Sequence, residues 1–394
     1  KGSGTMWVDN VNLRYTKQNF SVKEFLAPYK DSVFSKAKLI IPTPKKVKQG
    51  EKYNLFKIKQ KPLNPLIVIP QNTGSLTYKA AKNLRNKLLQ ISKEKHPGKK
   101  RNIEIKKDVS LQSLKKWSIV FSIGNNNLNN SVETQSFNDS IKKYKDGYYV
   151  KKTGDKTPVI CLKGSSQRGN YYAVQTVSQL FDKPNAYYHH ANIIDYPDFI
   201  NRGIVCKSDY NTFKRKEELI TRYRFTHLYA PLKSGSVAQV KESLKNTTDL
   251  FADNHLVKQG LVINPYKIYN KKNESLDKAD IPRFKEVLGL LNQAQSKGIN
   301  DYIINIDNTF SVKDSCLCIF HFDSEKNHIK YRSLLDVHKD IMNQIANNLN
   351  GDAQISFLPL WNNTKCIRKS QGKGELYLKE LFRKIPDKVN YLWT

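Results

Sequence analysis

The sequence predicts an α/β protein in two parts, an N-terminal α/β domain and a (β/α)8-type TIM barrel that is truncated after strand six. Apolar runs of strand length alternate with amphipathic stretches of helix length through most of the chain. In the second half the alternation becomes regular, which is typical of parallel strands joined by crossover helices. The pattern contains six such units, whereas a closed barrel has eight.

The chain has 394 residues, which is enough for two domains. Its 39% hydrophobic and 11% aromatic content is sufficient for packed cores. We expect an N-terminal extension over residues 1–40, an α/β domain over 41–196 and a barrel domain over 197–394.

The α/β domain is predicted to contain two apolar strands, two helices with apolar spacing of three and four, and one hairpin. The strands cover Pro65–Pro70 and Trp117–Gly124, and the helices cover Leu76–Lys93 and Gln167–Phe181. In the hairpin, residues 146–152 pair with 158–164 around a turn near Gly154.

The barrel domain is predicted from apolar strands that each precede a helix. The strands cover residues 203–210, 226–232, 259–266, 301–307, 354–360 and 389–394, and the helices cover Phe213–Tyr223, Val237–Asn254, Ile281–Lys297, Tyr331–Leu349 and Glu375–Arg383.

The formal net charge of +32 predicts attraction to polyanions such as acidic glycans, nucleic acids or anionic membrane surfaces. The alternative is a lysine bias of an AT-rich coding sequence, which would also explain the abundant asparagine. The basic residues are mostly lysine and are spread along the chain, without zinc-finger or helix-turn-helix patterns. The sequence therefore argues against specific nucleic-acid recognition.

Neither a metal nor a cofactor is expected. The five cysteines form no CxxC pair and no disulfide framework. The adjacent His189 and His190 lie on one extended segment, where neighbouring side chains face opposite ways. No apolar run approaches the roughly 20 residues of a transmembrane helix, so no membrane span is expected.

A set of short motifs occurs in a characteristic order along residues 40–394. They are IIPTPKKV, DGYYVKK, ICLKGSSQRGNYYAVQTVSQL, IIDYPDFINRGIV, FTHLYAPL, YIINIDN, HKDIMNQIANNL, ISFLPLW and NYLWT. In this order the motifs resemble glycoside hydrolase family 84, the β-N-acetylglucosaminidases that include O-GlcNAc hydrolases and bacterial hyaluronidases. The resemblance implies that the α/β domain is of the hexosaminidase N-terminal type.

The resemblance also implies a substrate-assisted mechanism, in which the 2-acetamido oxygen of the sugar attacks the anomeric carbon and forms an oxazoline. One carboxylate orients the acetamido group, and its neighbour protonates the leaving oxygen. Asp307 matches the first position, and Asn308 stands at the second, where the family has its general acid/base. An amide cannot supply a proton. A structural alternative for Asp307 is a carboxylate that only caps the next loop.

Other positions of the family's site are also changed. Lys207 replaces a glycine that leaves room for the sugar, and Leu232 replaces a sugar-binding lysine, with Lys233 one step later. Trp361 and Asn362 follow strand five, where the family has a tyrosine. Trp361 would either stack on a sugar face or cover the barrel. Lys207, Lys233, Trp361 and Asn362 are therefore the expected substrate-binding residues beside Asp307.

Three functions remain open at this stage. The first is an inactive glycosidase-like domain kept for saccharide binding or for assembly at an extracellular or cell surface. The second is an active β-N-acetylglucosaminidase that takes its acid from Asp209 or Asp323. The third is a basic module that binds polyanions. The expected partners are N-acetylglucosamine-containing or acidic glycans, and a C-terminal fragment or partner chain that completes the barrel.

Overall fold

The computed structural model describes most of the chain as two compact units. The sheet unit comprises Leu13–Ile200 with Glu218–Arg224, and the barrel unit comprises Lys1–Asn12, Asn201–Glu217 and Phe225–Thr394. The described residues are 6–8, 40, 42–58, 61–98, 101–130, 135–154, 157–199, 201–205, 221–232, 237–249, 257–264, 281–305, 334–358, 383, 386 and 388–391.

The sheet unit is built on a mixed sheet of eight described strands, in the order β10-β11-β8-β9-β7-β5-β6 with β2 also paired to β11. Strands β6, β5, β7 and β9 are parallel, and β8 joins β9 as the antiparallel hairpin that the sequence predicts. The bounds are β2 Lys46–Asn54, β5 Leu66–Ile69, β6 Glu104–Lys107, β7 Val120–Ile123, β8 Tyr148–Thr153, β9 Val159–Gly164, β10 Phe181–Asp182 and β11 Tyr187–Asp195, with β3 Lys57–Ile58 and β4 Lys61–Pro62 as a separate ribbon.

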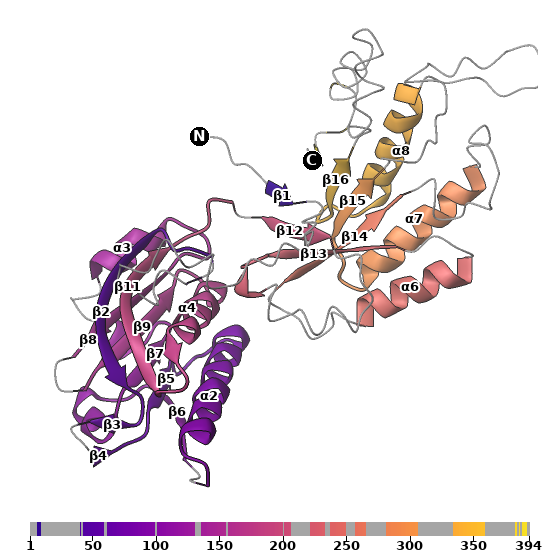
Figure 1. Ribbon diagram of the computed structural model, residues 1–394. Helices are drawn as coiled ribbons and strands as arrows, with labels where there is room; N and C mark the ends of the chain where they lie inside the picture. Colours follow the sequence, from indigo (N-terminus) through magenta and orange to yellow (C-terminus); the bar gives the residue numbers. More distant parts are fainter. Residues whose placement is uncertain are drawn as a thin grey trace, which may run out of the picture. The chain divides into compact units, whose positions relative to one another are not determined.

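Helices cover this sheet because its central strands β5 and β7 are mostly apolar and buried on both faces. The helices α2 (Ser75–Lys95) and α4 (Gln167–Gln179) lie side by side on one face (Figure 1). On β5 the alternate residues Leu66 and Val68 belong to a core cluster with side chains of α3 (Gln135–Lys142) and of the 3-10 turns η3 (Leu111–Lys116) and η4 (Asn127–Asn129). The predicted helices at Leu76–Lys93 and Gln167–Phe181 are confirmed.

The barrel unit contains a parallel sheet in which the described strands β12 to β17 follow chain order. Helices α6, α7 and α8 connect strands and pack on one face, where their apolar side chains meet those of the sheet. The bounds are β12 Arg202–Val205, β13 His227–Pro231, β14 Lys258–Ile263, β15 Asp301–Asn305, β16 Gln354–Leu358, β17 Val389–Tyr391, α6 Val237–Asp249, α7 Ile281–Ser296 and α8 Leu334–Asn348.

The six predicted barrel strands and three of the predicted helices are thus confirmed, and the fold is an N-terminal α/β domain followed by a partial parallel barrel. The predicted helices at Phe213–Tyr223 and Glu375–Arg383 lie almost wholly outside the described residues. Among the described helices, none has the length and apolar character needed to cross a bilayer.

The N-terminal residues contribute a strand that the sequence pattern did not indicate. Strand β1 (Met6–Val8) pairs in parallel with β12, with Trp7 in register with Gly203. It lies on the side of β12 opposite β13 (Figure 1). Part of the segment that we expected as an extension therefore belongs to the parallel sheet.

Gly164, at the end of β9, allows the close approach of α4 to the sheet. A Cβ atom on Gly164 would lie 2.3 Å from the backbone carbonyl carbon of Gly169 and 2.4 Å from the backbone nitrogen of Asn170. The Asn170 side chain accepts a hydrogen bond from the Gly164 amide at 2.7 Å. Because the clashing atoms are backbone, a side chain here requires the helix to move.

We predict that Gly164→Ala lowers the free energy of unfolding by roughly 1–3 kcal/mol, the usual cost of overpacking. Urea denaturation followed by circular dichroism measures the change. The matched control is Gly289→Ala on α7, where a Cβ would meet nothing within 4 Å; this helical substitution should stabilise the protein by about 0.5–1 kcal/mol. Unchanged stability of Gly164→Ala would contradict the close packing of α4.

Candidate functional site

Parallel pairing brings the carboxyl ends of the barrel strands to one edge of the sheet. Asn305 at the end of β15 is in register with Leu358 at the end of β16. Likewise Ile263 of β14 pairs with Ile304, and Pro231 of β13 pairs with Val262. In parallel α/β barrels this edge carries the active site, so a functional site is expected at this edge.

The residues expected at the site follow these strand ends directly. Lys207 comes after β12, Lys233 after Leu232, Asp307 and Asn308 after β15, and Trp361 and Asn362 after β16. All six lie outside the described residues, as do the alternative acids Asp209 and Asp323. The structure therefore fixes the strands from which these residues emerge and leaves their geometry as a prediction.

The face of the sheet that points away from the helices carries its own small cluster. Tyr229 of β13 and Ile303 of β15 are buried there, with Val205 and Val262 packed against them. Tyr229 lies over Gly260 of the neighbouring strand, where a Cβ would come within 2.3 Å of the tyrosine ring. A glycine on β14 thus makes room for the ring, and this face is filled by side chains in the way typical of a barrel interior.

A buried histidine and aspartate stand at the opposite end of the same strands. His227 begins β13 and Asp301 begins β15, and both are almost fully buried. The His227 Nε2 atom lies 3.6 Å from an Asp301 carboxylate oxygen, and His227 Nδ1 lies 2.8 Å from the Thr226 hydroxyl. Since both residues occupy the amino ends of their strands, they belong to the scaffold end of the barrel rather than to its active-site edge.

Burial controls the electrostatics of this pair. It raises the pKa of the Asp301 carboxyl above its ordinary value, and the positive charge of Lys258 opposes that rise in part. Burial, followed by the negative charge of Asp301, also raises the pKa of Tyr229. These side chains were not singled out from the sequence, because a histidine and an aspartate about 70 residues apart give no local signal until the strands pair.

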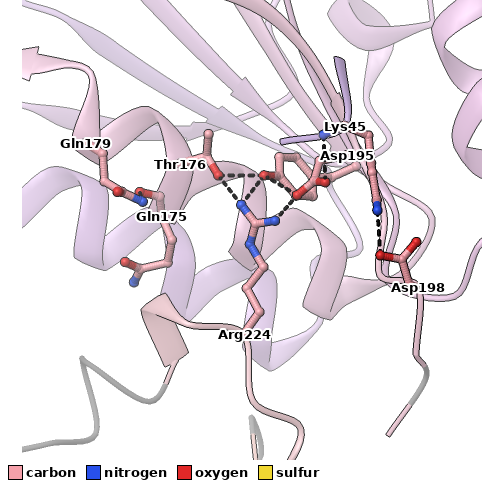
Figure 2. A network of polar contacts seen from close by, with 8 residues as sticks. Lys45, Gln175, Thr176, Gln179, Asp195, Asp198 and Arg224 are labelled. Atoms are coloured by element: carbon pink, nitrogen blue, oxygen red, sulfur yellow. Dashed lines mark hydrogen bonds and ion pairs between the residues drawn. The ribbon is translucent and has the colours of Figure 1, made fainter. Parts of the chain in front are cut away.

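The sheet unit contains a second buried polar network, centred on Arg224 (Figure 2). The guanidinium of Arg224 forms an ion pair with Asp195 at the end of β11. It donates to the Tyr148 hydroxyl at 2.5 Å and to the Thr176 hydroxyl at 3.1 Å. Tyr148 in turn donates to Asp195 at 3.1 Å. The backbone amide of Lys45 adds a bond of 3.2 Å to the same carboxylate.

This network joins β8, β11 and α4 to the segment that contains Arg224. Burial raises the pKa of Tyr148, while Arg224 and the Thr176 hydroxyl act in the opposite direction. Arg224 has a positive φ of 62°, a conformation that costs a non-glycine residue about 1 kcal/mol or more. Its polar groups are mutually satisfied, so we assign the network a structural role.

His189 and His190 make separate contacts, as expected for neighbours on a strand. His189 Nε2 lies 3.6 Å from Asp182. His190 is buried between Tyr188 and Asn192, and burial lowers its pKa to about 4. Within the described part of the chain, no group of three or more metal-binding side chains comes together.

The sheet unit of the chain matches a known protein family. Residues 38–196, which span the sheet unit, match the family described as Glycosyl hydrolase family 20, domain 2. No curated protein matches the chain.

Three solved structures are similar over 90% of this chain. They are CpGH84B (16% identity, TM-score 0.55), the β-N-acetylhexosaminidase from Bacteroides fragilis NCTC 9343 (11%, TM-score 0.53) and a glycoside hydrolase family 20 β-N-acetylglucosaminidase (12%, TM-score 0.53). The chain spans 56%, 69% and 74% of their lengths, respectively. At these identities the likeness shows the fold, which is that of the hexosaminidases of families 20 and 84. It does not single out family 84.

We predict that Asp301→Asn stabilises the protein increasingly as pH rises. Because burial raises the pKa of Asp301 in the folded state, the wild-type protein must carry a desolvated charge above that pKa. The stability lost by this group therefore grows from about pH 4, near the ordinary aspartate value, up to the folded-state pKa and then stays constant. Urea denaturation of both proteins from pH 4 to 8 measures the difference.

The control is Lys258→Gln. It should destabilise the wild-type protein at high pH, because it removes the cation that favours the Asp301 charge, and it should have little effect in the Asp301→Asn background. If Asp301→Asn instead becomes less stable than wild type as pH rises, the His227 contact outweighs desolvation and the prediction is wrong.

Proposed function

We propose that this chain is a family 84-like, catalytically inactive hexosaminidase domain that binds N-acetylhexosamine-containing glycans at the carboxyl edge of its barrel. The observation that carries the proposal is the pair Asp307–Asn308, which directly follows the fourth barrel strand. In family 84, which this chain resembles, two adjacent carboxylates follow the fourth barrel strand. Here the second is an amide.

The two positions have different consequences for chemistry. The Asp307 carboxylate can accept a hydrogen bond from an acetamido N–H, which requires no proton transfer. The Asn308 amide can donate to a glycosidic oxygen, but it cannot protonate the departing alcohol. Loss of a general acid typically lowers the rate by about 10²–10⁴. Recognition of the sugar can therefore survive a change that removes hydrolysis.

The remaining expected site residues fit binding better than turnover. Lys207 and Lys233 supply positive charge, which suits an acidic glycan, and Trp361 supplies a flat apolar face for a sugar ring. We further propose that such a domain acts at an extracellular or cell surface, because that is where its glycan ligands are displayed.

We predict that Asn308→Asp creates hydrolysis of chitobiose, which the wild-type protein should leave intact. An alcohol leaving group needs protonation, so this substrate reports on the general acid, and the gain should reach about 10²-fold over background. Product is measured as released N-acetylglucosamine. The double variant Asp307→Ala/Asn308→Asp should lose the gained activity.

Binding is tested separately by titration of chitobiose into the wild-type protein. Asp307→Ala should abolish the heat of binding, whereas Asn308→Asp should keep it. Wild-type turnover at ordinary enzyme rates of about 1–10³ s⁻¹ would show that another residue acts as the general acid. If the wild-type protein does not bind chitobiose, the proposed saccharide-binding function is wrong.

A second function is favoured by the charge of the chain. The net charge is +32, and the edge strand β2 exposes Lys46, Lys48 and Lys52. Strand β2 pairs with β11 and with no other described strand. Exposed lysines on an edge strand prevent edge-to-edge aggregation, and they also attract polyanions.

We predict that the protein binds immobilised heparin at about 0.05 M salt and is released well below about 1 M, where charges are screened within roughly 3 Å. Changing Lys46, Lys48 and Lys52 to Gln should lower the elution salt more than changing Lys82, Lys93 and Lys95 of α2, which removes the same charge. Equal shifts would indicate general attraction without a preferred face, and retention unaffected by salt would exclude an electrostatic mechanism.

A further inference from the structure

Strand β1 occupies a particular place in the parallel sheet. Its residues Met6, Trp7 and Val8 pair with Arg202, Gly203 and Ile204 of β12. The other side of β12 pairs with β13, and each later strand pairs with the next along the chain. We number β12 as the first barrel strand and β13 as the second. The neighbour of β12 on the side away from β13, which is β1, then stands in the position of the eighth strand.

We propose that residues 6–8 serve as strand eight of the barrel. In chain order the barrel then runs from strand eight, through the inserted sheet unit, to strands one to six. The strand sequence is thus a circular permutation of the usual one, in which strand eight follows strand seven. This inference rests on backbone pairing and is independent of the function proposed for Asp307 and Asn308.

The direction of β1 supports this assignment. A strand that merely covered the exposed edge of β12 could run either way, and an antiparallel strand satisfies the same backbone groups. Strand eight of a barrel has to be parallel to strand one, and β1 is parallel. In register, Trp7 is level with Gly203, which is level with His227 at the start of β13.

The assignment changes what is needed to close the barrel. Without β1, the six strands β12 to β17 would leave two neighbouring places to be filled. With β1 in place, the described strands leave one place, between β17 and β1. Closure at this place requires one parallel strand, whose backbone would pair with β17 on one side and β1 on the other.

Hydrogen exchange of the full-length protein tests the pairing. Val8→Pro removes a backbone donor of β1 and disfavours strand pairing there, whereas Val8→Ile keeps a β-branched residue. Amides of β12 should exchange about tenfold faster or more in Val8→Pro, because protection reports local opening, while amides of β15 should keep their protection. In Val8→Ile both strands should match the wild type. Unchanged exchange of β12 in Val8→Pro overturns the proposal.

Cysteine cross-linking tests the direction and register. In a background without the five native cysteines, Met6→Cys should be joined by a short bifunctional maleimide to Arg202→Cys within one chain, and only weakly to Val205→Cys. Preferred linking to Val205→Cys indicates an antiparallel strand, and linking only between chains indicates a strand donated by a second copy. Either result overturns the assignment, and neither depends on glycan binding or hydrolysis.

Discussion

The position of the expected site depends on one constraint, the parallel pairing of β12 to β17. Parallel neighbours cannot be joined by a tight turn, so each connection has to cross back over the sheet, and the described helices α6, α7 and α8 do this on one face. All strands then end at the same edge. The described ends of β12, β13, β15 and β16, which are distant in sequence, are therefore brought to one edge by strand pairing alone.

Buried polar groups lie away from that edge and hold the scaffold. His227 and Asp301 are at the amino ends of the barrel strands, and Arg224, Tyr148 and Asp195 tie together elements of the sheet unit. Desolvation of a charge in the interior is expensive unless it is paired. Asp195 has an arginine partner, whereas burial outweighs the neighbouring positive charge at Asp301 and raises its pKa. The position of His227 and Asp301, away from the carboxyl edge of the barrel strands, agrees with a structural role.

The elements that could be predicted are those with a local signal. The hairpin of β8 and β9, helix α2 and the strand β15 are all visible as apolar periodicity or as an apolar run. Strand β1 is only three residues long, and its partner lies almost 200 residues away, so no window of sequence contains the information. Arg224 and Asp195 are only about 30 residues apart, but neither lies in a periodic pattern that would indicate their pairing. The site residues came from the order of motifs, which identifies positions but does not orient side chains.

The described parallel sheet is stabilised by groups other than the expected site residues. The stability of the parallel sheet comes from backbone pairing and from the apolar cluster shared with its helices, and the described strands and cluster include neither Asp307 nor Asn308. A change of side chain at position 307 or 308 is therefore expected to leave the described strands paired. It follows that a hexosaminidase-type fold by itself carries no information about turnover. In the mechanism that the resemblance to family 84 implies, turnover depends on a proton donor, and we propose that Asn308 stands in its place.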